Sequence, residues 1–335
     1  MTRRQRLADL IGRIAKAGPK LIALDFLLAR QMDNCGTQAP AGAAGSGTAP
    51  AAPVGDTDRE ADRRVSPDRA DGCHRGQEAL RLALATTPSV VAALLDIDTV
   101  GGPNVATPIV VAPPQPSLRP WAAAGIDMPS DGVLEAASGV GVASLAGGTD
   151  GIVRTVPLLA AGGDSVLPGL AVEIVRVSQQ ASAIILGGGP NQMQIGALMI
   201  PLSADAELRF YPATAAEQAA RTVPAAEVLS GAVADDLLKG KIVLVGGSAA
   251  ELGALRETAR GPLVPSVQIH ADAVATMLAG KAPFRPGFAP MLERLGLLAM
   301  CAVVCWIGIT APPVTALSVA AVTLTCASSI SAEAF

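Results

Sequence analysis

The sequence predicts an α/β fold, with a mixed, largely parallel central sheet flanked by helices and followed by a C-terminal transmembrane helical hairpin. Helix-type and strand-type patterns alternate along the first part of the chain, and this alternation is typical of parallel strand pairing. Of the 335 residues, 50% are hydrophobic and only 16% are charged, whereas soluble domains are about 25% charged. The apolar excess is greatest at the C-terminus, where membrane segments are therefore expected.

The N-terminal segment, residues 2–20, predicts an amphipathic helix. Its leucines and isoleucines recur at helical spacing, and a Gly-Pro pair ends the pattern. The basic start is not followed by an apolar stretch, so the segment lacks the pattern of a signal peptide. Residues 20–25 then read as a short buried strand.

A low-complexity insertion is predicted at about residues 36–74. Small residues fill its first half, and charges of both signs crowd the second. Neither half can bury enough apolar area to offset the entropy lost on ordering, so the insertion is expected to be disordered and His74 to be exposed. Cys35 and Cys73 bracket it. A disulfide between them would close the loop in an oxidising compartment, and two free thiols are the alternative.

The rest of the N-terminal part returns to regular patterns. The predicted elements are, in chain order, a helix at 77–86, a strand at 89–95, a long proline-rich connection at 101–131, a strand pair at 140–145 and 152–158 around a Gly-Asp turn, a helix at 170–177, a second strand pair at 194–200 and 207–211, a helix at 225–238, a core strand at 241–245 and a helix at 269–278.

Residues 295–332 carry no charge. Two prolines divide this stretch into predicted transmembrane helices at 295–311 and 314–330, each near the lower limit of the roughly 17–25 residues that a span needs. Residues 286–294 are the predicted linker into the membrane. Two buried helices of a large soluble core are the alternative. Small residues on the helices would allow a second copy to approach closely, which favours a homodimer.

Charge and composition exclude some functions. The net charge of −4 gives no basic surface for nucleic acid, and the 2% of aromatic residues offers few rings for stacking on bases. No metal or other cofactor is expected, because His270, one of two histidines, has no partner at metal-ligand spacing. No nucleophile–base pair is evident either.

Gly246, Gly247 and Ser248 follow the predicted strand at 241–245. A dinucleotide-binding fingerprint would require glycine at 248 and 251, where serine and glutamate stand. A strand-exit turn is the first interpretation, and backbone N–H groups that bind a small anion are the second. Asp25 ends another strand. Because carboxyl ends of strands face ligand crevices, Asp25 either shares a pocket with this turn or caps a helix or loop.

Three further residues are candidate ligand contacts. His270 begins a predicted helix and is either a packed polar anchor to a neighbouring loop or a sensing group, because histidine titrates near neutrality. Asp150 and Arg154 are either a turn residue and a strand-face ion pair or contacts to a ligand.

Four sequence blocks in fixed order resemble the CHASE2 domain, an extracytoplasmic sensor module of bacterial signalling proteins. The blocks are RLADLI followed by LIALDF within residues 6–26, GTDGIVRTVPL at 148–158, LPGLAVE at 167–173, and LKGKIVLVGGSA at 238–249 continuing to VPSVQIHADA at 264–273. The resemblance covers roughly residues 6–285 and assigns residues 1–285 to a sensory domain.

The resemblance implies a non-enzymatic sensor for an unidentified small molecule, anchored in the bacterial inner membrane with its domain in the periplasm. The family's usual output, an adenylate or diguanylate cyclase or a histidine kinase, is expected on a missing segment or a partner chain. Basic residues before the first membrane helix would by themselves place the domain in the cytoplasm. A nucleotide-dependent α/β enzyme with a membrane anchor and a truncated, non-functional gene product are the alternatives.

Overall fold

The computed structural model describes residues 3–28, 67–98, 108–189, 191–249, 255–283 and 288–310. It divides into two compact units, Met1–Ala282 and Pro283–Phe335. The predicted insertion up to residue 66, Cys35 and the second predicted membrane helix at 314–330 lie outside the described residues, as does the side chain of Cys73. The proposed disulfide and the transmembrane hairpin therefore remain predictions.

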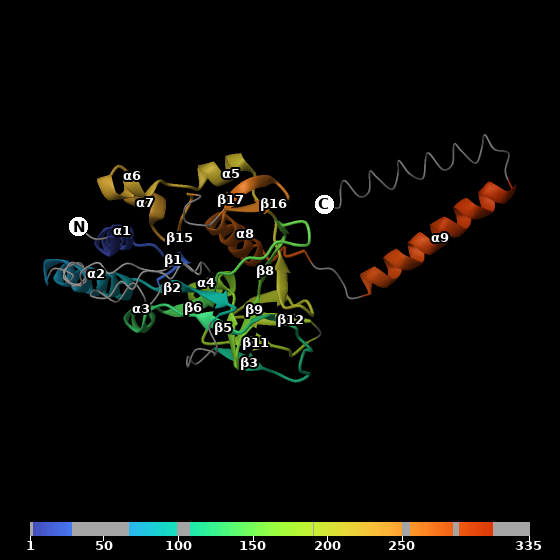
Figure 1. The fold of residues 1–335 in the computed structure, drawn as a ribbon, viewed down its shortest axis with the longest axis horizontal. Helices are drawn as coiled ribbons and strands as arrows, with labels where there is room; N and C mark the ends of the chain where they lie inside the picture. Colours follow the sequence, from blue (N-terminus) through green and yellow to red (C-terminus); the bar gives the residue numbers. More distant parts are fainter. Residues whose placement is uncertain are drawn as a thin grey trace, which may run out of the picture. The chain divides into compact units, whose positions relative to one another are not determined.

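The central sheet of the N-terminal unit is mixed (Figure 1). Strand β1 pairs in parallel with β15 and β2, the first half of β2 pairs in parallel with β6, and its second half pairs antiparallel with β5. The five strands are β1 (Leu21–Leu27), β2 (Ser89–Asp96), β5 (Gly125–Asp127), β6 (Gly139–Val142) and β15 (Ile242–Gly246). Strands β1, β2 and β15 confirm the predicted strands at 20–25, 89–95 and 241–245.

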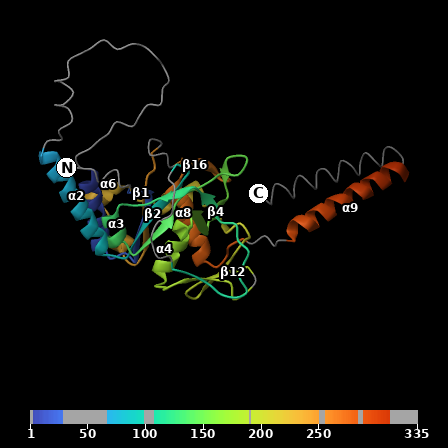
Figure 2. The ribbon, with the colours of Figure 1, turned by 60° about the horizontal axis from the view of Figure 1, so that its bottom comes forward.

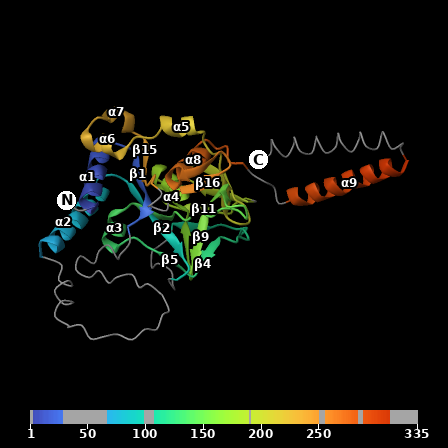
Figure 3. The same cartoon turned by 45° about the horizontal axis from the view of Figure 1, so that its top comes forward.

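Helices cover both faces of this sheet. Ile22 and Leu24 pack in one apolar cluster with α1 (Arg3–Lys16) and α2 (Pro67–Ala85). Leu21 and Ala23 pack in another with α4 (Leu170–Ser178) and α8 (Ser266–Leu278). Figures 2 and 3 show α1 and α2 side by side, with α4 and α8 across the sheet from them. Burial on both faces explains why β1 is a continuous apolar run and not an alternating one.

Smaller sheets complete the unit. Their strand orders are β10-β9-β4, β13-β12-β11-β3, β14-β8 and β17-β16-β7. The strands are β3 (Ile109–Val111), β4 (Trp121–Ala123), β7 (Ile152–Val153), β8 (Thr155–Pro157), β9 (Leu159–Gly162), β10 (Ser165–Pro168), β11 (Ile184–Leu186), β12 (Gln192–Ile195), β13 (Leu198–Pro201), β14 (Glu207–Arg209), β16 (Leu255–Thr258) and β17 (Gly261–Pro265). The other helices are α3 (Asp131–Ala136), α5 (Ala215–Ala220), α6 (Ala225–Ser230), α7 (Asp235–Leu238) and α9 (Ala289–Thr310).

The two strand pairs predicted around turns are wrong, whereas the parallel pairing of β1 with β2 is as expected. The strands around the Gly-Asp turn do not form a hairpin, because β6 pairs with β2, β7 with β16 and β8 with β14. The predicted strand at 194–200 is itself a hairpin of β12 and β13. The long connection at 101–131 contains β3, β4 and β5. Turn chemistry marks where the chain bends, but long-range burial selects which strands pair.

Three predicted boundaries also change. Helix α2 begins at Pro67, so the last part of the predicted insertion is helical, and His74 is exposed on that helix as expected. The predicted helix at 225–238 is broken after α6, where Gly231 adopts a φ of 78°. Most of the predicted linker at 286–294 belongs to α9, which begins at Ala289.

In the C-terminal unit, α9 is long and apolar enough to cross a membrane. Within the described part of the chain, it is the one helix that meets this criterion, over Met291–Thr310. Large apolar side chains such as Leu298, Trp306 and Ile309 are exposed along it. Such a helix agrees with the first predicted membrane span at 295–311.

We predict that replacing Gly141 and Gly12 by alanine changes the free energy of unfolding in opposite directions. A Cβ at Gly141 on β6 would lie 2.7 Å from the Leu170 Cα at the start of α4, whereas a Cβ at Gly12 in α1 meets nothing within 4 Å. Gly141→Ala should lower the free energy of unfolding by about 1–3 kcal/mol through overpacking. Gly12→Ala should raise it by about 0.5–1 kcal/mol through helix propensity. Urea denaturation of the detergent-solubilised chain measures both, and a neutral Gly141→Ala would contradict the close packing.

Candidate functional site

Three polar side chains meet where the central strand β1 ends and helix α8 begins. The Nδ1 atom of His270 lies 2.9 Å from Oδ1 of Asp25. The Ser266 hydroxyl donates a hydrogen bond of 2.5 Å to Oδ2 of the same carboxylate. We call these residues the Asp25 cluster. It contains two of the residues that the sequence nominates, Asp25 and His270, and one that it does not, Ser266.

Local structure explains the cluster. The register of β1 against β2 shifts between Leu24 and Leu27, so Asp25 lies where the ladder is irregular, and such irregularities change the direction of the side chains they contain. On the other edge of β1, Asp25 pairs in register with Gly246. Ser266 and His270 are four residues apart on α8, and this spacing places both on one helix face.

The cluster is sealed from solvent. The side chains of Asp25 and His270 are 2% and 1% exposed. The His270 ring lies at ion-pair distance from the carboxylate, but its N–H is not aligned for a hydrogen bond, and among the described residues Nε2 has no hydrogen-bond partner. Because a buried carboxylate is costly unless it is paired, the cluster ties α8 to the end of β1.

The order of the three groups differs from that of a serine hydrolase. In such enzymes the imidazole lies between serine and carboxylate and takes the serine proton. Here the carboxylate lies between the other two, and the Ser266 proton is directed to Asp25. The arrangement can hold two elements together, which agrees with the interpretation of His270 as a packed polar anchor, with the end of β1 as its partner. Ligand contact by Asp25 or His270 stays a prediction.

Gly246, the last residue of β15, has a packing role. A Cβ at Gly246 would collide with the Val267 side chain in the first turn of α8. Glycine is therefore needed for the close approach of α8 to the sheet. Gly247 is half-buried and Ser248 is exposed. Anion binding by the backbone of these three residues remains a prediction.

The opposite side of α8 holds a second polar network that the sequence analysis does not identify. Asp272 is 3% exposed in its side chain and forms an ion pair of 2.6 Å with Arg221. Its other oxygen accepts a hydrogen bond of 3.0 Å from the backbone N–H of Ala213. Gln268 accepts from Arg221, and Thr276 accepts from the backbone of Tyr211. The spacing of these three α8 residues by four is a signal that could have revealed this face.

Asp150 and Arg154 form the predicted ion pair, at 2.9 Å. The Arg154 guanidinium and the backbone N–H of Ile152 hold the pKa of Asp150 below its usual value. The pair lies on either side of β7, whereas the Asp25 cluster lies between β1 and α8. The structure therefore does not gather all of the candidate residues into one site, and a ligand role for Asp150 and Arg154 remains untested.

We predict that the two members of the buried pair are energetically coupled. Asp25→Asn and His270→Gln should each lower the free energy of unfolding by about 2–3 kcal/mol, because each leaves a buried polar partner poorly satisfied. The double variant should lose at least about 1 kcal/mol less than the sum. Denaturant unfolding of the four proteins measures the coupling.

The exposed pair of Arg119 and Asp205, 2.9 Å apart, provides a matched control. The same cycle there should show a coupling below about 1 kcal/mol. Equal coupling at both pairs would contradict the role assigned to burial.

We also predict that Gly246→Ala destabilises the fold by about 1–3 kcal/mol through overpacking against α8. When Val267→Gly is added in the same chain, the combined loss should be smaller than the sum of the two single losses, because glycine removes Cβ, Cγ1 and Cγ2 of Val267, the atoms that the new Cβ would meet. Thermal and urea unfolding of both single variants and the double variant test this. If the losses from Gly246→Ala and Val267→Gly simply add, the role of Gly246 in α8 packing is wrong.

Comparison with known proteins agrees with the resemblance described above. The model of the CHASE2 domain family matches residues 1–311, which include the whole N-terminal unit and α9. The CHASE2 domain is an extracellular sensor domain of signalling proteins and is not itself catalytic. No curated protein and no solved structure matches the chain. Because the match extends over most of its length, the chain belongs to the CHASE2 domain family.

Proposed function

We propose that this chain is a membrane-anchored sensory module of bacterial signal transduction. Its N-terminal unit lies in the periplasm and binds a small molecule, and α9 anchors it in the inner membrane. The family supports the sensory role, and the length and apolar surface of α9 support the anchor. A second helix at 314–330 would complete a membrane hairpin.

The observation that carries the proposal is the position of α8. This helix is bound on one side to β1 through His270 and on another to residues 211–222 through Asp272. Along the chain, it ends at Leu278, and α9 begins at Ala289. A ligand that favours one arrangement of the domain can therefore displace α8 and act on the start of the membrane helix.

The signal would be read by a catalytic output, such as a cyclase or a histidine kinase, on a further segment or a partner chain. Two copies of the chain would pair through their membrane helices. Gly296, Cys301 and Gly308 lie on α9, and small residues allow close helix approach in a bilayer. In this arrangement the chain binds and transmits but does not catalyse.

Cysteine labelling tests the orientation. In a chain whose natural cysteines are replaced by alanine, Ala219→Cys places a thiol on exposed α5, and Ala311→Cys places one directly after α9. We predict that a membrane-impermeant maleimide labels position 219 in bacterial cells with a permeabilised outer membrane, and labels position 311 only after lysis.

The two positions control for each other, because both thiols should react fully in lysed cells. The reverse pattern would place the domain in the cytoplasm and contradict the proposal, as would labelling of neither position before lysis.

A further inference from the structure

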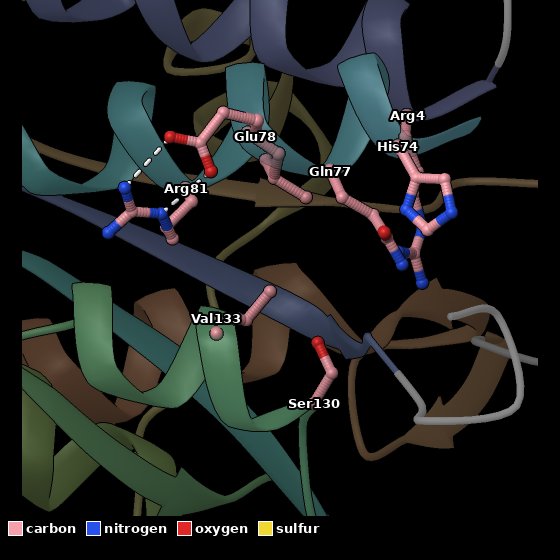
Figure 4. A pocket seen from close by; sticks show the side chains of 9 residues that line it. Arg4, His74, Gln77, Glu78, Arg81, Ser130 and Val133 are labelled. Atoms are coloured by element: carbon pink, nitrogen blue, oxygen red, sulfur yellow. Dashed lines mark hydrogen bonds and ion pairs between the residues drawn. The ribbon is translucent and has the colours of Figure 1, made fainter. Parts of the chain in front are cut away.

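A hollow of about 310 Å³ lies between helices α1, α2 and α3, away from the Asp25 cluster. We call it the α1–α3 hollow. Its volume lies at the lower end of the range for small-molecule sites. Figure 4 shows the side chains around it.

Hydrogen-bond donors gather at one end of the α1–α3 hollow. Arg4 comes from α1, and His74 and Gln77 come from the start of α2. Their guanidinium, imidazole and amide groups lie together on the side facing Ser130 (Figure 4). Arginine has N–H groups arranged as a fork that matches a carboxylate, and glutamine and histidine can each donate an N–H as well.

Ser130 adds an independent indication of a ligand. It occupies the N-cap position of α3, where a serine hydroxyl normally accepts a hydrogen bond from the first turn, yet its side chain makes no cap hydrogen bond. The residue is only 4% exposed, and its oxygen is directed into the hollow (Figure 4). Within the described structure, no hydrogen-bond partner is found for this hydroxyl. Because this hydroxyl does not cap α3, it is available to bond a ligand oxygen that enters the hollow.

The one carboxylate that lines the described part of the hollow is already paired. Arg81 donates two hydrogen bonds to Glu78, of 2.8 and 2.9 Å, at the other end of the hollow. This contact holds the pKa of Glu78 below its usual value. Glu78 therefore stays ionised and bound to Arg81. Its negative charge is balanced by Arg81, so it does not serve as the anion for the donors at the opposite end of the hollow.

The wall between the two ends is apolar. Leu80 and Val133 line it and are 1% and 5% exposed. A cavity with a donor-rich end and an apolar wall fits a molecule with a negative head and a short hydrocarbon part. We infer that the α1–α3 hollow binds a small organic carboxylate, held by Arg4, His74, Gln77 and Ser130.

The hollow connects to the Asp25 cluster through the backbone. The N–H of Ser130 donates a hydrogen bond of 3.0 Å to the carbonyl of Leu28, directly after β1, and Asp25 lies in β1. A ligand that moves Ser130 therefore acts on the strand end to which α8 is tied. Only this consequence rests on the proposed function, since binding itself does not require signalling.

Calorimetry on the full chain in detergent tests the inference, with butanoate as the probe. Butanoate should bind with a dissociation constant of about 1 mM, as suits so small a ligand. The neutral amide butanamide and the cation butylammonium should not bind. Arg4→Gln and Ser130→Ala should each weaken butanoate binding at least tenfold. Arg6→Gln, an equal loss of charge at an exposed position of α1, should leave it unchanged.

Thermal unfolding of each variant verifies that it folds, and Gln77→Ala serves in place of any variant that does not. Absence of butanoate binding, equal binding of butanamide, or unchanged binding in Arg4→Gln and Ser130→Ala would overturn the inference. Inorganic phosphate that binds as tightly as butanoate would overturn the carboxylate assignment. The labelling of positions 219 and 311 does not depend on these results, so failure here leaves the membrane orientation separately measurable.

Discussion

A carboxylate inside a protein has to be paired, and in this chain that requirement joins the central strand to the last helix of the N-terminal unit. Asp25 lies where the register of β1, a strand with helices packed on both of its faces, shifts against β2. Its partners come from α8, about 240 residues later in the chain. Since the cost of an unpaired buried charge is several kcal/mol, any motion of α8 away from β1 is opposed by this cluster.

Close helix packing depends on residues without side chains. Gly246 lets α8 approach β15, and Gly141 lets α4 approach β6. On α4 the buried Glu173 is bound by Arg176 in a bidentate pair, so the carboxylate that packs against the sheet is not left unpaired. Glycines on the strands thus set how closely the helices approach the sheet, and paired charges on the helices keep buried polar groups satisfied.

Much of the fold could be predicted from periodicity and composition. The strands around Asp25 and Val245, the helices α1 and α4, and the apolar α9 follow from local patterns. Strand pairing could not be predicted, because Gly-rich turns do not specify which distant strand buries a given edge. The site shows the same division. His270 and Asp25 could each be nominated from the sequence, but their pairing could not, because β1 and α8 are far apart in the chain and only folding brings them together.

The sequence by itself determined the family, the α/β class and the apolar C-terminal segment, because each depends on residue order or composition over a short window. Only the tertiary structure decided that α8 contacts both β1 and the segment at 211–222. It also decided that the hydroxyl of Ser130 faces a hollow and does not cap its helix. Such facts depend on the positions of side chains from several elements, and those positions are set by the packing of the whole unit.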